Sequence, residues 1–165
     1  MIKKLFEKYR EIIVYIGVGL LTTLVAYGVR FAVLYPFAAL LSIDLGVNNA
    51  EATVLRTAAI TVGWVAGVIF AFFTNKSWVF QDKVSEKRAV WVQFGKFTLS
   101  RVSTYFVEWA LGALVPMLLI ALGFVPFTFI VITVDADMLA TAVSIVLVTV
   151  LNYILSKLLV FTKKK

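Results

Sequence analysis

The chain has 165 residues, of which 62% are hydrophobic, with a mean hydropathy of +0.98 and a net charge of +7. Ordinary soluble domains contain roughly 45–50% apolar residues, so this composition excludes a water-soluble globular protein and leaves no length for a soluble catalytic domain. The absence of cysteine and histidine excludes disulfides, thiolate or imidazole metal sites and nucleophilic chemistry by these side chains.

The first half of the chain predicts two membrane spans. Residues 1–11 place apolar and basic residues at helical spacing, which predicts a short interfacial helix. A first span follows over about Ile12–Tyr35 and breaks near Pro36. Its apolar run is longer than the roughly 7–15 residues of a signal-peptide core, so we expect a span rather than a signal peptide. An acidic outer loop then leads to a second span over about Val54–Thr74.

The second half predicts two more spans. The third runs over about Trp91–Leu122, where Gly123 and Pro126 stop it. The β-branched and aromatic stretch at residues 125–137 is too short to cross a bilayer, so we expect an outer interfacial loop there. The fourth span covers about Met138–Phe161. The predicted fold class is therefore an all-α integral membrane protein with four transmembrane helices.

The positions of lysine and arginine predict the orientation of these spans. Cytoplasmic loops of membrane proteins hold the excess of these residues. Most of the 16 basic residues fall on one side of the four spans, and only Arg56 lies near the other side. The residues on the basic side are Lys3, Lys4, Lys8, Arg10, Lys76, Lys83, Lys87, Arg88, Lys96, Lys157, Lys163, Lys164 and Lys165. We therefore expect both termini on the cytoplasmic side, where anionic lipid rather than nucleic acid attracts the positive charge.

The two halves of the chain match each other at a spacing of 81 residues. A K-x-x-V-F pattern closes the second span at residues 76–80 and the fourth span at residues 157–161. The openings of the first and third spans match more loosely. These matches predict two parallel two-helix repeats, at about residues 1–80 and 87–165, related by an axis along the membrane normal. The alternative is that any apolar helix ending at an interface attracts a lysine and an aromatic residue.

Three charged residues lie inside the predicted spans: Arg30, Arg101 and Glu108. A charge near the bilayer centre costs at least about 2.5–3.5 kcal/mol, so each one needs a partner, water or a function. Arg101 and Glu108 lie two helical turns apart on one face with Thr104 and Tyr105, but about 10 Å of axial separation disfavours a direct pair. Glu108 could instead pair with Arg30, and such a pair could serve a function or only join two helices.

Polar residues also gather at the ends of the second and fourth spans. Asn75 and Lys76 close the second span, and Asn152 and Lys157 lie on the last turns of the fourth. With Arg101 they would form a cationic, hydrogen-bonding cluster at the cytoplasmic mouth, which suits a phosphate. Ordinary snorkelling at helix ends explains the two lysines about as well, but it explains Asn152 less readily.

Motifs for catalysis are absent from the sequence. There is no Walker motif, no D-x-D cluster and no pair of catalytic carboxylates. Gly63-x-x-x-Gly67 on the second span is a small-residue packing motif for helix association. We therefore expect no enzyme activity, cofactor or metal.

Two sequence segments carry a resemblance to a known family. The first span reads YIGVGLLTTLVAY, and the second ends in FFTNKSWVF. With four spans in this order, the chain resembles the GtrA-like family over nearly its whole length. The most specific part is the N-x-x-W-x-F exit at residues 75–80, which Asn152 and the K-x-x-V-F exit of the fourth span echo. The fourth span departs from the pattern because Leu158 and Leu159 replace the tryptophan-bearing exit.

The resemblance implies a flippase for a polyprenyl-phosphate-linked monosaccharide in the inner membrane of a prokaryote. Partner glycosyltransferases would then add the sugar to cell-surface polysaccharide, teichoic acid or lipopolysaccharide. In this interpretation Arg101, Lys76 and Lys157 capture the phosphate, and Trp78 or Tyr105 stacks on the sugar. The side chains expected to form hydrogen bonds with the substrate are Thr22, Asn75, Thr104, Glu108 and Asn152.

Two other functions remain open. A small proton-coupled cation exporter would use Glu108 as its titrating carboxylate, although such proteins are generally shorter and usually carry this glutamate on the first helix. A non-transporting membrane anchor would hold a polyprenyl-phosphate glycosyltransferase at the bilayer. The expected partners are membrane lipid and such glycosyltransferases. The small interior enclosed by four helices favours a homo-oligomer.

Overall fold

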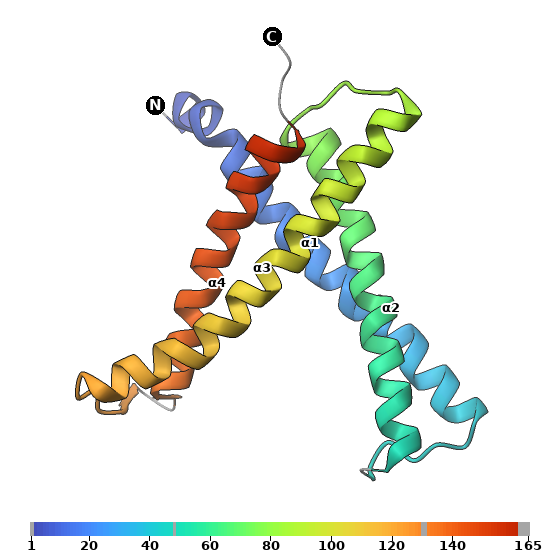
Figure 1. Cartoon of the computed structure of the whole chain (residues 1–165), viewed down its shortest axis with the longest axis vertical. Coiled ribbons are helices and arrows are strands. Elements are labelled where there is room, and N and C mark those ends of the chain that lie inside the picture. The colour runs from blue at the N-terminus through green and yellow to red at the C-terminus, as the bar shows by residue number, and fades with distance from the viewer. Residues whose placement is uncertain (1, 48, 130–131, 162–165) are drawn as a thin grey trace. The chain divides into compact units, whose positions relative to one another are not determined.

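The computed structural model describes residues 2–47, 49–129 and 132–161. Within this part of the chain, four helices are long and apolar enough to cross a bilayer. This finding confirms the predicted all-α membrane fold. The chain divides into two compact units, Met1–Lys83 and Val84–Lys165, and each unit is built on one pair of helices (Figure 1).

The first pair consists of α1 (Ile2–Leu40) and α2 (Ala50–Thr74), and α2 continues into a five-residue π-helix, η1 (Asn75–Val79). The segment predicted as a short interfacial helix is helical and runs without a break into the first span, while its position at the interface stays a prediction. Asn49 caps α2, because its Oδ1 accepts a hydrogen bond from the backbone N–H of Ala52 at 2.8 Å. The predicted second span lies within α2.

α1 also continues through Pro36, so the predicted break at this residue is wrong. Proline removes one backbone donor from a helix, but packing by a neighbouring helix compensates for this loss in membrane proteins. Leu34 and Ala38, on either side of Pro36, are buried in one apolar cluster with Leu55 and Ala59 of α2. This packing keeps the turn around Pro36 helical.

The second pair consists of α3 (Lys87–Ala121) and α4 (Ala136–Leu155), and α4 continues into a second π-helix, η2 (Ser156–Val160). Between α3 and α4 lie two short strands, β1 (Phe127–Phe129) and β2 (Ile132–Val134), which pair in antiparallel fashion. The expected irregular loop is therefore a β-hairpin in its described residues, as the β-branched and aromatic composition favours.

A residue in the left-handed region follows both α1 and α3. Ser42 has a φ of 55° after α1, and Gly123 has a φ of 80° after α3. In both places the next backbone N–H donates to the carbonyl five residues before it, at 2.9 Å, which is the Schellman arrangement. The predicted stop of the third span at Gly123 is confirmed.

Close backbone packing joins α1 to α2. Gly63 and Gly67, the predicted small-residue motif, are both buried. A Cβ atom at Gly63 would lie 2.5 Å from the backbone oxygen of Ala26, and one at Gly67 would lie 3.1 Å from the Cβ of Ala26. A side chain at Gly63 would therefore push the two helices apart, which confirms this packing face.

The cytoplasmic orientation of the termini and the duplication of the helix pair stay predictions. Part of the charge that supports the orientation lies outside the described residues and side chains. The lysines concerned are Lys3, Lys4, Lys8, Lys163, Lys164 and Lys165.

We expect Gly63→Ala to destabilise the first helix pair, because the new methyl group would collide with the backbone oxygen of Ala26. Overpacking of this kind costs about 1–3 kcal/mol. Thermal unfolding in detergent micelles measures the effect. The control is Gly17→Ala, since an added Cβ at Gly17 has no atom within 4 Å. Equal stability of the two variants would contradict the packing.

Candidate functional site

Each helix pair ends in a short π-helix with a lysine at its second residue. This lysine is Lys76 in η1 and Lys157 in η2. The residue after each π-helix donates its N–H to the carbonyl of the first residue, at 2.9 Å in η1 and 2.8 Å in η2. Single π-helical turns occur frequently at functional sites. The K-x-x-V-F pattern marked both positions in the sequence, but it did not reveal the π-helical geometry.

Lys76 forms an ion pair within the first unit. Its Nζ lies 2.8 Å from Oδ2 of Asp82, and the two side chains are only 11% and 13% exposed. The backbone N–H of Asp82 also donates to the carbonyl of Lys76 at 2.8 Å. Lys76 therefore fixes the chain where it leaves η1, in addition to any contact with a phosphate. Sequence reasoning missed Asp82, whose acidic side chain six residues after the lysine was the available signal.

Asn75 is almost completely buried, with 2% exposure. Its Nδ2 donates to the carbonyl of Ala71 at 2.7 Å, whereas its Oδ1 has no partner among the described residues. Trp78 is half-exposed, and its carbonyl accepts a hydrogen bond from Nη2 of Arg10 at 3.2 Å. Arg10 thus binds the carbonyl end of η1, a role that the sequence did not suggest because Arg10 only appeared in the charge pattern.

Thr22 and Arg30 lie on the face of α1 that packs against the glycines of α2. The hydroxyl of Thr22 donates to the carbonyl of Val18 at 2.8 Å, and its methyl group faces α2. The guanidinium carbon of Arg30 lies 5.7 Å from the ring centroid of Tyr27 and 5.6 Å from that of Phe31. The Nε of Arg30 is buried without a partner among the described residues. Both side chains therefore contribute to helix packing.

A buried hydrogen bond joins α3 to α4 in the second pair. The hydroxyl of Thr104 donates to Oδ1 of Asn152 at 2.9 Å, and these residues are 2% and 9% exposed. Ser100, one turn earlier on α3, is also buried and donates to the carbonyl of Phe97 at 2.7 Å. Two predicted site residues, from opposite halves of this unit's sequence, therefore meet directly.

Two cationic side chains lie on the same pair. The guanidinium carbon of Arg101 is 4.6 Å from the centroid of the Phe97 ring, which is a cation–π distance. The Nζ of Lys157 donates to the hydroxyl of Tyr153 at 2.9 Å, and its side chain is exposed. Arg101 lies three residues before Thr104 on α3, and its guanidinium extends over the ring of Phe97, about one turn closer to the start of the helix.

The residues that helical spacing placed on one polar face of the third span differ in their burial. Thr104 is buried against α4, whereas Tyr105 and Glu108 are exposed. The predicted pair of Glu108 with Arg30 stays a prediction, because these residues belong to different units.

The second pair brings together more of the predicted site than the first. It joins Thr104 directly to Asn152 and carries Arg101 on the same helix as Thr104, while Asn75 and Lys76 are neighbours in η1. A single cluster made from both groups stays a prediction, since the two groups lie in separate units.

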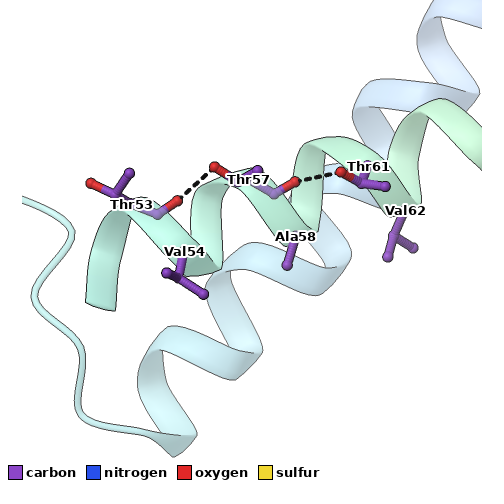
Figure 2. Close-up of a pocket in the computed structure, with 6 residues that line it drawn as sticks. All are labelled: Thr53, Val54, Thr57, Ala58, Thr61 and Val62. Atoms are coloured by element: carbon purple, nitrogen blue, oxygen red, sulfur yellow. Dashed lines mark hydrogen bonds between the residues drawn. The ribbon is translucent and has the colours of Figure 1, made fainter. Parts of the chain in front are cut away.

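A shallow, open groove lies on the exposed face of α2 (Figure 2). The hydroxyls of Thr57 and Thr61 donate to the carbonyls of Thr53 and Thr57, each at 2.9 Å, as Figure 2 shows. Because these hydroxyl protons are used within the helix, the groove presents mainly methyl groups. Such a surface suits lipid chains better than a polar substrate. The lining residues are Thr53, Val54, Thr57, Ala58, Thr61 and Val62.

Comparison with known proteins finds one family model and several similar sequences. The sequence model of the family described as GtrA/DPMS, transmembrane domain, matches residues 14–161. The cell wall teichoic acid glycosylation protein GtcA of Listeria monocytogenes is 31% identical over 105 residues, which are 64% of this chain and 63% of GtcA. GtcA of Listeria innocua is 32% identical over 106 residues, again 64% of this chain and 63% of the relative. The chain thus spans less than two thirds of these relatives.

A further relative covers almost the whole chain. The membrane protein YwcD of Bacillus subtilis is 28% identical over 151 residues, which are 92% of this chain and 96% of YwcD. No solved structure matches the chain.

We expect Thr104→Val and Asn152→Ala each to destabilise the second pair, because each removes the side-chain hydrogen bond that joins α3 to α4. The loss should be smaller for Asn152→Ala, since the hydroxyl of Thr104 can still donate to the carbonyls of Ser100 and Arg101, each at 3.1 Å. Side-chain hydrogen bonds between membrane helices contribute about 0.6 kcal/mol on average and up to about 1.7 kcal/mol. Unfolding of both single variants and of the double variant in mixed micelles gives the coupling energy. A coupling energy of zero would show that the two side chains do not stabilise the pair together.

Charge reversal tests the ion pair at η1. Lys76→Asp and Asp82→Lys should each lower the melting temperature, because each places two like charges at a site with little exposure. The loss should be about 1.5–3 kcal/mol, as for hydrogen bonds to charged groups. The double variant should recover most of this stability. If its loss equals the sum of the single losses, the two side chains do not interact.

Proposed function

We propose that this chain, which belongs to the GtrA/DPMS transmembrane domain family, moves a lipid-linked sugar across a membrane. The chain is a multi-pass membrane protein with four spanning helices in its described part. The proposed cargo is a polyprenyl-phosphate-linked monosaccharide, which passes from the cytoplasmic to the outer leaflet. The sugar would then be used to glycosylate cell-surface polysaccharide or teichoic acid, and the names of the Listeria relatives support this pathway.

The buried hydrogen bond between Thr104 and Asn152, on the helix pair that also carries Arg101, is the observation that carries this proposal. A phosphate and a sugar ring are expensive to place in hydrocarbon, because they lose their contacts with water. A protein that moves them must offer counter-charge and hydrogen bonds below the lipid surface. Arg101 offers a guanidinium fork for the phosphate, while Asn152 and Thr104 offer an amide and a hydroxyl for the sugar.

The other predicted contacts receive unequal support. Lys157 adds a second cation to the pair that holds Arg101, so we propose that it also binds the phosphate. Thr22 and Lys76 already form contacts within the first pair, which gives them a smaller proposed share in binding. The remaining proposed sugar contacts are Asn75, Trp78, Tyr105 and Glu108.

The proposed partners follow from the proposed cargo. The chain would carry out no chemical step, so glycosyltransferases in the same membrane must attach the sugar to its lipid carrier and later transfer it to the polymer. We place the protein in the inner membrane of a prokaryote with both termini in the cytoplasm. An anchor that only holds such a glycosyltransferase at the bilayer is the alternative.

Purified protein in liposomes tests transport directly. A fluorescent polyprenyl-phosphate sugar is placed in one leaflet, and its appearance in the other leaflet is followed with time. We expect exchange with the wild-type protein and a loss of roughly tenfold or more with Arg101→Ala and Asn152→Ala, because each removes a contact with a charged or polar group. Arg88→Ala, at an exposed arginine in the first turn of α3, is the control.

The anchor and the transporter give different results in this assay. An unchanged leaflet distribution with pure, folded wild-type protein would favour the anchor. Equal losses in Arg88→Ala and Arg101→Ala would show that the general positive charge, rather than the position of Arg101, matters.

A further inference from the structure

Two serine hydroxyls in the second pair are buried without a hydrogen-bond partner. Ser144 of α4 is 3% exposed and Ser156 of η2 is fully buried. Neither Oγ has a partner among the described residues. Other hydroxyls in membrane helices of this chain, such as that of Thr141, donate to the carbonyl four residues earlier. The hydroxyls of Ser144 and Ser156 therefore turn away from the carbonyls of their own helix.

These two serines lie on the side of the fourth span that is packed against α3. The buried residues of α4 include Ala140, Ser144 and Asn152, and α3 contacts both α4 and η2. Asn152 lies between the two serines in sequence and bonds to Thr104 of α3. From Ser144 to Ser156 the helix rises by about 18 Å, which is more than half of a hydrocarbon core of about 30 Å.

The first pair has different residues at the matching positions. Buried positions on the second helix of each pair recur at a spacing of 81 residues, which supports the proposed duplication. At this spacing Ser144 matches Gly63, Asn152 matches Ala71 and Ser156 matches Asn75. The matched buried positions are Leu55 and Ala136, Ala59 and Ala140, Gly63 and Ser144, Ala71 and Asn152, Asn75 and Ser156, and Val79 and Val160.

At two of these three positions packing does not require a polar residue. The first pair places glycine at the position of Ser144, where the backbones approach closely, and alanine at the position of Asn152. Only the position of Ser156 is polar in both pairs, since it holds Asn75, whose Oδ1 is also buried without a partner among the described residues. An unpaired buried hydroxyl costs stability, whereas alanine has nearly the same size and carries no such cost. Serine at these two positions, on either side of an amide that is bonded across the interface, leaves two buried hydroxyls available to a polar group that enters between α3 and α4.

We propose that the interface between α3 and α4 receives the hydroxyl groups of the sugar headgroup, and that Ser144, Asn152 and Ser156 line this route. This inference rests on the proposed transport of a lipid-linked sugar. The hydrogen bond between Thr104 and Asn152 joins α3 to α4 in the absence of substrate. When the sugar enters, its hydroxyl groups replace this bond by forming hydrogen bonds with both side chains.

Ser144→Ala and Ser156→Ala test the route in the full chain. Each variant should move the complete lipid-linked sugar roughly three- to tenfold more slowly in liposomes, as expected for the loss of one hydrogen bond. Its melting temperature should stay equal or rise, because an unpaired buried hydroxyl has been removed. The matched control is Ser103→Ala, since Ser103 is exposed on α3 and donates to the carbonyl of Leu99 at 2.9 Å.

A set of lipid-linked sugars, each lacking one hydroxyl, identifies the contact. If a serine binds a sugar hydroxyl, one analogue should be moved at the same rate by the wild type and by the alanine variant. Three results would overturn the inference: rates equal to those of Ser103→Ala, the same slowing for every analogue, or a fall in melting temperature that parallels the slowing. A wild-type protein that moves no lipid-linked sugar would refute the proposed function, and this inference falls with it.

Discussion

The lack of water in the hydrocarbon core governs this structure. Each polar group inside the bilayer must find its partner within the protein, so the chain forms long helices that satisfy their own backbones. The same rule explains why Thr57 and Thr61 donate to their own helix and why Thr104 bonds to Asn152 across two helices. Departures from the rule are few among the described residues, and the proposed sugar route is built on two of them, Ser144 and Ser156.

Much of the fold follows from the sequence for this reason. An apolar run of about 20 residues or more leaves spanning as its only stable arrangement, so hydropathy located all four helices. The motif at Gly63 and Gly67 was also recognised as a packing face, because small residues at this spacing permit close backbone contact, but its partner, Ala26 of α1, came from the structure. Pro36 was misread because the local rule for proline takes no account of the packing of Leu34 and Ala38 on α2.

The residue types of the candidate site were easier to predict than their partners. Sequence alone could indicate that buried amides and cations need a function, but the ion pair of Lys76 with Asp82 depends on a turn that only the structure reveals. The sequence also suggested that Asn152 echoes Asn75. Burial instead matches Asn75 with Ser156 and Asn152 with Ala71, because the π-helices align at a spacing of 81 residues. With this alignment, the second pair has polar residues, Ser144 and Asn152, where the first pair has Gly63 and Ala71.

The contact between Arg10 and the carbonyl of Trp78 connects positions 68 residues apart in the chain. Through this hydrogen bond, the amino-terminal part of α1 stabilises the end of the second helix. A fusion partner or affinity tag at the amino terminus that displaces Arg10 would therefore weaken the contact with the turn that holds Asn75 and Lys76. Expression without an amino-terminal tag leaves this contact intact.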